Sequence, residues 1–456
     1  MRNTAKRRNK TRTDMSFAYF PHTADEIRAM LEKIGVGTLD DLYADVPKDV
    51  VFDGNYDLPE AKSEPEVRRR FSEMEKKNRR LVVMAGGGAY DHYAPAAVGA
   101  LLSRSEFLTA YTPYQAEISQ GTLRYIFEFQ SMIAELTGMD CSNASMYDGA
   151  TAAAEAMMMA VASVRKRTRV LISSTLLPQV REVVKTYGKY HGLAVEEIGS
   201  RDGVTDLDDL SRLLETDDVA GVLVPSLNRF GIIEDLTGFA DAVHARKALL
   251  AVYADPSALA VVRTPGEWGA DIACGDGQSL GIPLSFGGPY VGFLACRKDY
   301  VRKLPGRIVG ATTDVDGKRA FVLTLQAREQ HIRREKANSN ICSNQSLMAL
   351  YVTIYLSLVG KEGLREVNEL AYGGAHYLYE QLKATGKFSP VFDRPFLKEF
   401  VMKTSLPVDK LQKALLDGGF FAALPTEEGY VSFCVTEQRT KEEIDRMVDL
   451  INSLEL

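Results

Sequence analysis

The chain has 456 residues, of which 45% are hydrophobic and 25% are charged, proportions typical of a globular protein. This length accommodates two or three domains. The formal net charge of -6 argues against nucleic acid or an anionic membrane surface as the main partner. No apolar run approaches the roughly 18 residues of a membrane span. Five scattered cysteines and six histidines form no zinc-binding pattern, so we expect no metal site and a reducing, cytoplasmic location.

Residues 1–14 form a basic extension with six arginine and lysine side chains against a single acid. No apolar segment follows them, which argues against a secretory signal. We expect this extension to be disordered or to precede the true initiator at Met15; a short transit peptide is the alternative. Residues 15–80 follow as a helical arm, because apolar side chains recur at helical spacing over residues 24–34, behind the candidate cap Thr23.

Residues 81–344 alternate between β-rich runs and helical stretches. We expect strands at residues 170–173, 194–198, 221–224, 249–254, 271–273 and 291–296, and helices at residues 149–164, 179–190, 207–214 and 238–246. Such alternation predicts a large α/β domain whose mostly parallel sheet is covered by helices on both faces.

Residues 345–456 follow a different order, which predicts a small C-terminal α+β domain. Two apolar helices come first, over residues 345–358 and 363–385. A strand, a helix, a second strand and a second helix then follow, at residues 398–403, 408–417, 430–435 and 441–454.

A turn of small residues precedes the alanine-rich helix at 149–164. Asp148, Gly149 and Thr151 lie at its start, where free N–H groups and the positive end of the helix dipole attract anions. The pattern is that of a phosphate site, although a helix merely capped by Asp148 has the same signature.

Asp255 follows the buried strand 249–254, at the carboxyl end where ligands bind in parallel sheets. An aspartate there could keep the pyridine nitrogen of pyridoxal phosphate protonated; a loop aspartate that caps the next turn is the alternative. Enzymes that use this cofactor hold it as a Schiff base on a lysine. No lysine occurs between Lys247 and Lys298, and polar Ser279 stands in the glycine-rich loop where that lysine is expected.

Two further segments are dense in polar side chains. The first, a loop-like stretch where functional residues tend to concentrate, contains Tyr111, Tyr114, Gln115 and Glu117. Single tyrosines more often pack with the hydroxyl at the surface, which is the alternative there. The second segment is charged, and its Arg333 and Arg334 could contact an anionic group across an interface, although a salt-bridged helix has the same composition.

Together these segments resemble one family, the P-protein of the glycine cleavage system, glycine dehydrogenase (decarboxylating). The matching stretches are Tyr19-Phe-Pro-His-Thr23, Gly88-Ala-Tyr-Asp-His-Tyr93, residues 111–121, Tyr147-Asp-Gly-Ala-Thr151, residues 275–289, Pro305-Gly-Arg-Ile-Val-Gly310, and residues 328–336 with Ser339-Asn-Ile-Cys342. The resemblance implies the fold of the aspartate-aminotransferase-like, fold type I enzymes that depend on pyridoxal phosphate. The glycine run at 84–88 and the basic extension depart from the family pattern.

The chain is about half as long as the single-chain members of that family and resembles their N-terminal half. The resemblance implies that the cofactor lysine belongs to a partner, P-protein subunit 2, and that Ser279 stands in its apparent place here. A vestigial cofactor pocket would remain at Asp148, Gly149, Thr151 and Asp255. Contributions to a shared interface site would come from Tyr111, Tyr114, Gln115 and Glu117.

The implied reaction is decarboxylation of glycine, followed by transfer of the aminomethyl group to the lipoyl arm of the H-protein. Two alternatives remain open. One is a structural subunit that stabilises its partner without touching substrate. The other is a stand-alone aminotransferase or decarboxylase that holds pyridoxal phosphate on an unexpected lysine.

Overall fold

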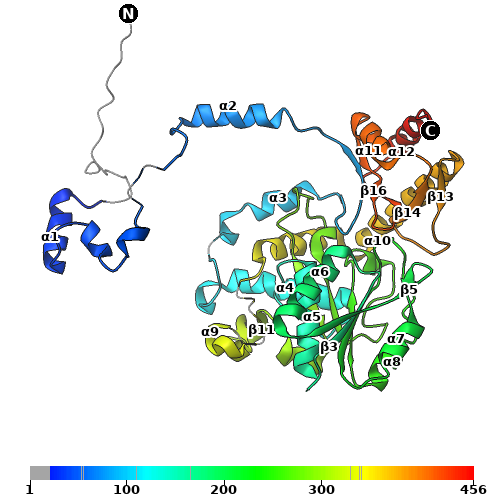
Figure 1. Cartoon of the computed structure of the whole chain (residues 1–456). Helices are drawn as coiled ribbons and strands as arrows, with labels where there is room; N and C mark the ends of the chain where they lie inside the picture. Colours follow the sequence, from blue (N-terminus) through cyan, green and yellow to red (C-terminus); the bar gives the residue numbers. More distant parts are fainter. Residues whose placement is uncertain are drawn as a thin grey trace, which may run out of the picture. The chain divides into compact units, whose positions relative to one another are not determined.

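The structure is a computed structural model that describes residues 21–52, 54, 56–108, 110–164, 166–328, 330–337, 339, 341 and 343–455 (Figure 1). The predicted basic extension at 1–14 lies outside the described residues. The chain divides into two compact units, residues 1–78 and residues 79–456. Because residues 79–456 form one unit, the predicted division between 81–344 and 345–456 stays a prediction.

The first unit contains the predicted helical arm. Its helix α1, Ala24–Ile34, matches the expected bounds and begins at a capping box. In that box the N–H of Glu26 donates to the hydroxyl of Thr23, and the Glu26 carboxylate accepts from the Thr23 N–H. Gly35 ends the helix in the left-handed conformation, with φ of 90°. A second capping box, Ser63 with Glu66, starts α2, Glu64–Glu75.

The second unit is built on a seven-stranded sheet with the order β2-β10-β9-β8-β7-β3-β4. Its strands are β2 Cys141–Ser142, β3 Arg169–Ser173, β4 Ala194–Ile198, β7 Val219–Pro225, β8 Leu249–Tyr253, β9 Ile272–Asp276 and β10 Gly292–Cys296. The neighbours from β9 to β4 pair in parallel, whereas β10 and β2 are antiparallel at one edge. The mostly parallel sheet predicted from the alternating pattern is confirmed.

Helices cover both faces of this sheet, because successive strand residues point to opposite sides. Val170 and Ile172 pack with α5, Gly149–Ser163, and α6, Pro178–His191, in one apolar cluster. Leu171 packs in a second cluster on the other face. That cluster contains residues of α4 Gln120–Thr137, α7 Leu207–Leu213 and α8 Phe239–Ala245. The remaining elements around the sheet are α3 Ala96–Leu102, β5 Ser200–Arg201, β6 Val204–Thr205, β11 Ile308–Thr313, β12 Arg319–Thr324 and α9 Gln330–Arg333.

The C-terminal residues form a four-stranded antiparallel sheet with the order β13-β14-β17-β16 (Figure 1). The strands are β13 Phe388–Pro390, β14 Glu399–Thr404, β16 Leu424–Pro425 and β17 Val431–Cys434, and the helices are α11 Val408–Asp417 and α12 Lys441–Asn452. The strand–helix–strand–helix order predicted for this part is confirmed. An early strand also joins it, since β1 Val82–Met84 pairs in parallel with β15 Phe420–Ala422. This pairing brings the loop after β1 close to β14.

Helix α10, Ser346–Ala384, connects the two parts of this unit. It consists of the two predicted helices, which meet at a break at Gly360, where φ is 64° and ψ is -176°. The helix is long and apolar enough to cross a membrane by length and composition. Its first half, however, contributes Val352 and Tyr355 to the core of the large sheet, and its second half contributes Leu378 to the C-terminal core. These contacts identify α10 as a core helix.

Candidate functional site

The carboxyl ends of β8 and β9 meet the start of α5 at one edge of the sheet. Asp276 ends β9, and its Oδ2 accepts a 2.8 Å hydrogen bond from the N–H of Gly149. Asp148 caps the same helix through a 2.7 Å hydrogen bond from the Thr151 N–H to its Oδ1. Two donors of the predicted phosphate site are therefore directed at carboxylates of the chain itself, which supports the capped-helix alternative.

Asp276 is largely but not fully buried in this arrangement. Burial raises the pKa of its carboxyl to about 7, against the opposing effect of hydrogen bonds from the backbone of Gly149 and Gln278. The neighbouring backbone is tightly packed, since a Cβ on Gly149 would lie 2.6 Å from the Tyr253 hydroxyl. The start of α5 is thus closed by packing as well as by hydrogen bonds.

Asp255 lies beside this turn and meets a lysine that the sequence did not point to. Lys398 is fully buried, and its Nζ lies 2.7 Å from Oδ2 of Asp255 and 3.0 Å from Nε2 of His92. The same ammonium is 4.1 Å from the centre of the Tyr90 ring. The Ser279 hydroxyl donates to Oδ1 of Asp255. Burial would raise the pKa of Asp255, but the charge and hydrogen bond of Lys398, together with the hydrogen bond from Ser279, outweigh burial and hold that pKa below its usual range.

His92 and Glu437 form the layer behind Lys398. Nδ1 of His92 lies 2.6 Å from the Glu437 carboxylate, which also accepts a 2.6 Å hydrogen bond from the Tyr93 N–H. Burial and the neighbouring Lys398 lower the pKa of His92, which favours the neutral ring. Because the Lys398 ammonium can only donate, Nε2 of His92 accepts from it and carries no proton. We therefore assign the ring proton to Nδ1, which donates to Glu437.

Glu399 explains the glycine run that departs from the family pattern. Its carboxylate accepts hydrogen bonds from the Gly87 N–H at 2.8 Å, the Ser432 hydroxyl at 2.8 Å and the Tyr90 hydroxyl at 3.1 Å. Burial raises the pKa of Glu399. A Cβ on Gly86 would lie 2.6 Å from that carboxyl group, so the loop after β1 needs glycine to approach it.

The residues at this edge do not fit pyridoxal phosphate. The cavity between them measures about 20 Å³, whereas pockets for ligands of that size measure about 300 Å³ or more. Its lining includes the predicted Asp255 and Ser279, together with Tyr90, Asn228, Tyr253 and Asp276. Ser279 cannot form a Schiff base, and Asp255 already faces an ammonium. Of the residues predicted for a vestigial pocket, only Asp255 lines this cavity, whereas Asp148, Gly149 and Thr151 are not part of its lining. The cavity leaves no space for the cofactor.

The predicted interface residues form a separate group. Tyr111 is 88% exposed, and its hydroxyl lies 2.8 Å from the hydroxyl of Ser343. Tyr114 accepts a 3.4 Å hydrogen bond from buried Arg307, whose guanidinium also lies 5.4 Å from the Tyr114 ring centre. The next predicted residues along this loop, Gln115 and Glu117, are exposed. None of these four residues lines the closed cavity.

The two predicted arginines are likewise at the surface. Arg333 is exposed and donates through Nε to the carbonyl oxygen of Ala327 at 2.9 Å. Arg334 is exposed as well, and its backbone adopts a positive φ of 54°. Neither contacts the closed cavity, so their predicted contact with an anion would involve a group outside it.

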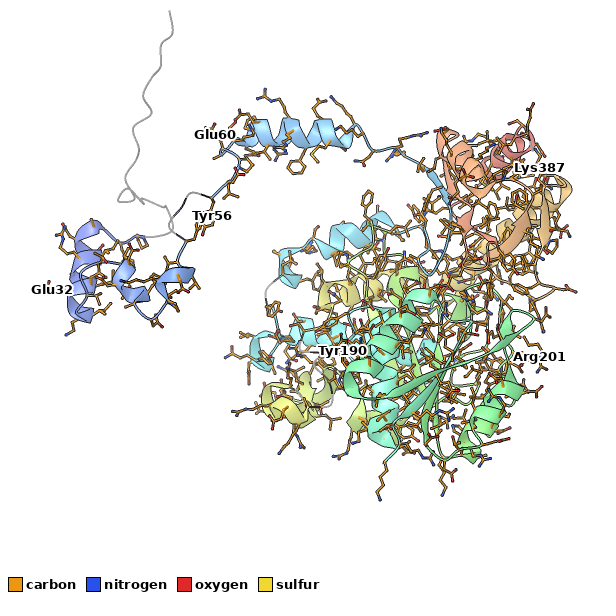
Figure 2. The ribbon with its side chains drawn as sticks, in the orientation of Figure 1. Glu32, Tyr56, Glu60, Tyr190, Arg201 and Lys387 are labelled. Carbon is orange, nitrogen blue, oxygen red and sulfur yellow. The ribbon has the colours of Figure 1, made fainter. Side chains whose placement is uncertain are left out.

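A second cavity of about 460 Å³ lies between α5, α6 and the residues Glu335, Ala337, Ser339 and Ile341. Its lining includes Tyr147, Tyr187 and Tyr190, the last of which is labelled in Figure 2. Glu155 is nearly buried at its wall and accepts a 2.8 Å hydrogen bond from Ser339. Burial raises the pKa of Glu155 to about 7.

Reasoning from the sequence missed Lys398, Glu399 and Glu437, although it singled out the stretch that contains Tyr90 and His92. The segment 398–403 was predicted to be a strand, and nothing in its sequence distinguished Lys398 from a solvated lysine. The signal lies in the contact of Lys398 with Asp255, which are far apart in sequence.

The comparisons with known proteins agree with the resemblance. The family model of the glycine cleavage system P-protein matches residues 17–451. A probable glycine dehydrogenase (decarboxylating) subunit 1 from Moorella thermoacetica is 51% identical over 436 residues, covering 94% of this chain and 98% of that relative.

Solved structures show the same architecture. A crystal structure of glycine decarboxylase (P-protein) of the glycine cleavage system, in inhibitor-bound form, has a TM-score of 0.88 and 42% identity, covering 95% of this chain and 99% of that one. An alanine–glyoxylate aminotransferase from Nostoc sp. has a TM-score of 0.58 and covers 88% of this chain and 99% of that one; at 17% identity it shows the fold alone. The expected aspartate-aminotransferase-like, fold type I architecture is confirmed.

Proposed function

The chain belongs to the glycine cleavage system P-protein family, and from this premise we propose that it acts as subunit 1 of a two-subunit glycine dehydrogenase (decarboxylating). The relative from Moorella thermoacetica that carries this name matches over nearly its whole length. The complex decarboxylates glycine and transfers the aminomethyl group to the lipoyl arm of the H-protein. Its place is the cytoplasm.

The partner, P-protein subunit 2, carries the pyridoxal phosphate. The observation that supports this assignment is the closed cavity, in which Ser279 and Lys398 satisfy Asp255 and leave about 20 Å³. Because this chain offers neither the space nor a lysine at position 279, it does not bind the cofactor by itself.

This chain contributes to the shared site from its exposed polar loop. Tyr111 and Tyr114 present aromatic rings and hydroxyl groups whose positions are held by Ser343 and Arg307. Gln115 and Glu117 add an amide and a carboxylate on the same loop. These groups line the interface beside the partner's reacting centre, where hydrogen bonds orient substrate and walls exclude water.

Arg333 and Arg334 serve as contacts for anionic groups outside this chain. Both guanidinium groups are exposed, and arginine suits flat, two-point contacts with carboxylate or phosphate. We assign them to anionic groups of the partner subunit or of the H-protein.

The test is cofactor labelling of the purified chain, alone and with subunit 2, by pyridoxal phosphate and borohydride followed by mass mapping. We expect the spectrum of an internal aldimine only when subunit 2 is present, and we expect the reduced cofactor to be attached to a lysine of subunit 2. Label on Lys398 or another lysine of this chain would instead establish a stand-alone enzyme. If the chain is a purely structural subunit, substitutions at Tyr111 and Tyr114 will leave the activity of the complex unchanged.

A further inference from the structure

We propose that Lys398 is an internal substitute for the cofactor: its ammonium supplies the positive charge that Asp255 would otherwise receive from a bound pyridinium, and it holds the C-terminal sheet against the large sheet. The contacts that carry this inference lie within this chain. It therefore goes beyond the proposed function and stands or falls without the partner.

The position of Asp255 is the first argument. It follows β8 at the carboxyl end of the central strands, and it is nearly buried. A buried carboxylate needs a positive charge or several donors, since desolvation otherwise disfavours its ionised form. Lys398 lies 2.7 Å from one oxygen, and Ser279 donates to the other, so both oxygens are engaged.

The surroundings of Lys398 are the second argument. Its Nζ faces Asp255, Nε2 of His92 and the face of the Tyr90 ring, three groups that each favour a cation at this point. His92 is itself held by Glu437 through Nδ1. An ammonium at the end of a flexible stem is thereby held from several sides in a space that excludes solvent.

The backbone that delivers Lys398 is the third argument. The carbonyl oxygen of Lys398 accepts a 2.9 Å hydrogen bond from the Val435 N–H, which keeps the residue in register with β17. A Cβ on Gly231, whose φ is +80°, would lie 1.9 Å from the carbonyl oxygen of Glu399. The start of β14 thus lies directly against the loop that follows β7, at a distance that only glycine permits.

These contacts join two parts of the unit on either side of the small cavity beside Asp255. Asp255 belongs to the large sheet, whereas Lys398 and Glu399 introduce β14 of the C-terminal sheet. The ion pair, together with the hydrogen bond from the Gly87 N–H to Glu399, closes this space. The pocket is consequently complete without any ligand.

The test uses the full-length chain and chemical rescue. Lys398→Ala removes the part of the side chain that corresponds to propylammonium, so it leaves a site for that cation beside Asp255. We expect the melting temperature to fall by several degrees and propylammonium chloride to restore most of the loss. Equal concentrations of propanol or sodium chloride should have little effect. Lys403→Ala, at an exposed position on the same strand, is the matched control and should show neither loss nor rescue.

A mutant cycle keeps the inference testable if Lys398→Ala does not fold. Lys398→Met retains the stem, and Asp255→Asn removes the opposing charge. We expect each single variant to be less stable than the unchanged protein. The double variant should be more stable than the two single effects added together predict, by more than about tenfold in the unfolding equilibrium constant. Rescue by propanol as good as by propylammonium, or additive effects in the cycle, would overturn the proposal. Activity of the complex with subunit 2 is measured separately, so that failure of the proposed function remains distinguishable.

Discussion

The backbone N–H of Gly149 donates a 2.8 Å hydrogen bond to Oδ2 of Asp276, so a carboxylate from β9 occupies the first turn of α5. In a phosphate site this turn would be free to receive a ligand. Here the anion comes from the chain itself, and its burial makes it sensitive to pH.

Asp276→Asn should reduce the dependence of stability on pH. The pKa of this carboxyl is raised by burial from 3.8 to about 7, so the folded state retains its proton where the unfolded chain has lost it. Its contribution is complete below pH 4 and is lost as pH rises towards 7. We expect the unfolding free energy of the unchanged protein to decline over this range by roughly 1 to 4 kcal/mol on account of this group.

Urea denaturation at pH 5 and pH 8 measures the effect, and exposed Asp299→Asn is the control. Glu155, whose pKa is also raised to about 7 by burial, adds a decline of the same sign. The double variant with Glu155→Gln should therefore have a smaller slope than either single variant. An unchanged slope in Asp276→Asn would show that this carboxyl is ionised in the folded protein.

Gly149→Ala should destabilise the protein by about 1–3 kcal/mol, although alanine is the better helix former. The added Cβ would lie 2.6 Å from the Tyr253 hydroxyl and 2.8 Å from the Asp276 Cβ. Gly373→Ala in α10 is the control, since no atom lies within 4 Å of its added Cβ, and it should be neutral or stabilising. Thermal unfolding of both variants measures the difference. Equal melting temperatures would mean that the start of α5 can shift to accommodate the added Cβ.

Tyr114→Phe should lower the activity of the assembled complex by about tenfold and leave the fold intact. The variant loses one hydrogen-bonding group at a half-exposed position, a loss of about 1.4 kcal/mol if that hydroxyl contacts the reacting centre. Glycine-dependent exchange of carbon dioxide in the complex measures this activity. Tyr190→Phe, at a 77% exposed tyrosine on α6, should retain full activity. Full activity in Tyr114→Phe would remove the hydroxyl of Tyr114 from the proposed site.

Lys387→Met should destabilise the C-terminal sheet and its helix by about 1–2 kcal/mol. Nζ of Lys387, labelled in Figure 2, donates to the carbonyl oxygens of Ile451 at 2.9 Å and Asn452 at 2.8 Å at the end of α12. The Ile451 carbonyl oxygen also accepts a 3.2 Å hydrogen bond from the Leu454 N–H, and the ammonium of Lys387 offsets the negative end of the helix dipole. Hydrogen exchange of α12 should rise in this variant and stay unchanged in exposed Lys410→Met.

Local pattern was sufficient for most of the elements. The parallel strands and the helices at 149–164, 179–190, 207–214 and 238–246 follow from apolar runs and their spacing, because each run has to bury its own side chains. Helix α4 was not predicted. The break in α10 at Gly360 follows from the gap between the two predicted helices, and the non-helical backbone there confirms them as two helices. The pairing of β1 with β15 had no local signal, since the two strands are brought together by the C-terminal core.

The sequence by itself determined the family, the alternating architecture and the absence of a lysine at position 279, since these depend on which residues follow one another. The tertiary structure alone decided what replaces the cofactor. Asp276 reaches the N–H of Gly149, and Lys398 reaches Asp255, across contacts between residues far apart in the chain. The physical reason is that a buried charge is stabilised by whichever opposite charge or donor the fold brings within about 3 Å, and sequence spacing carries no record of that distance.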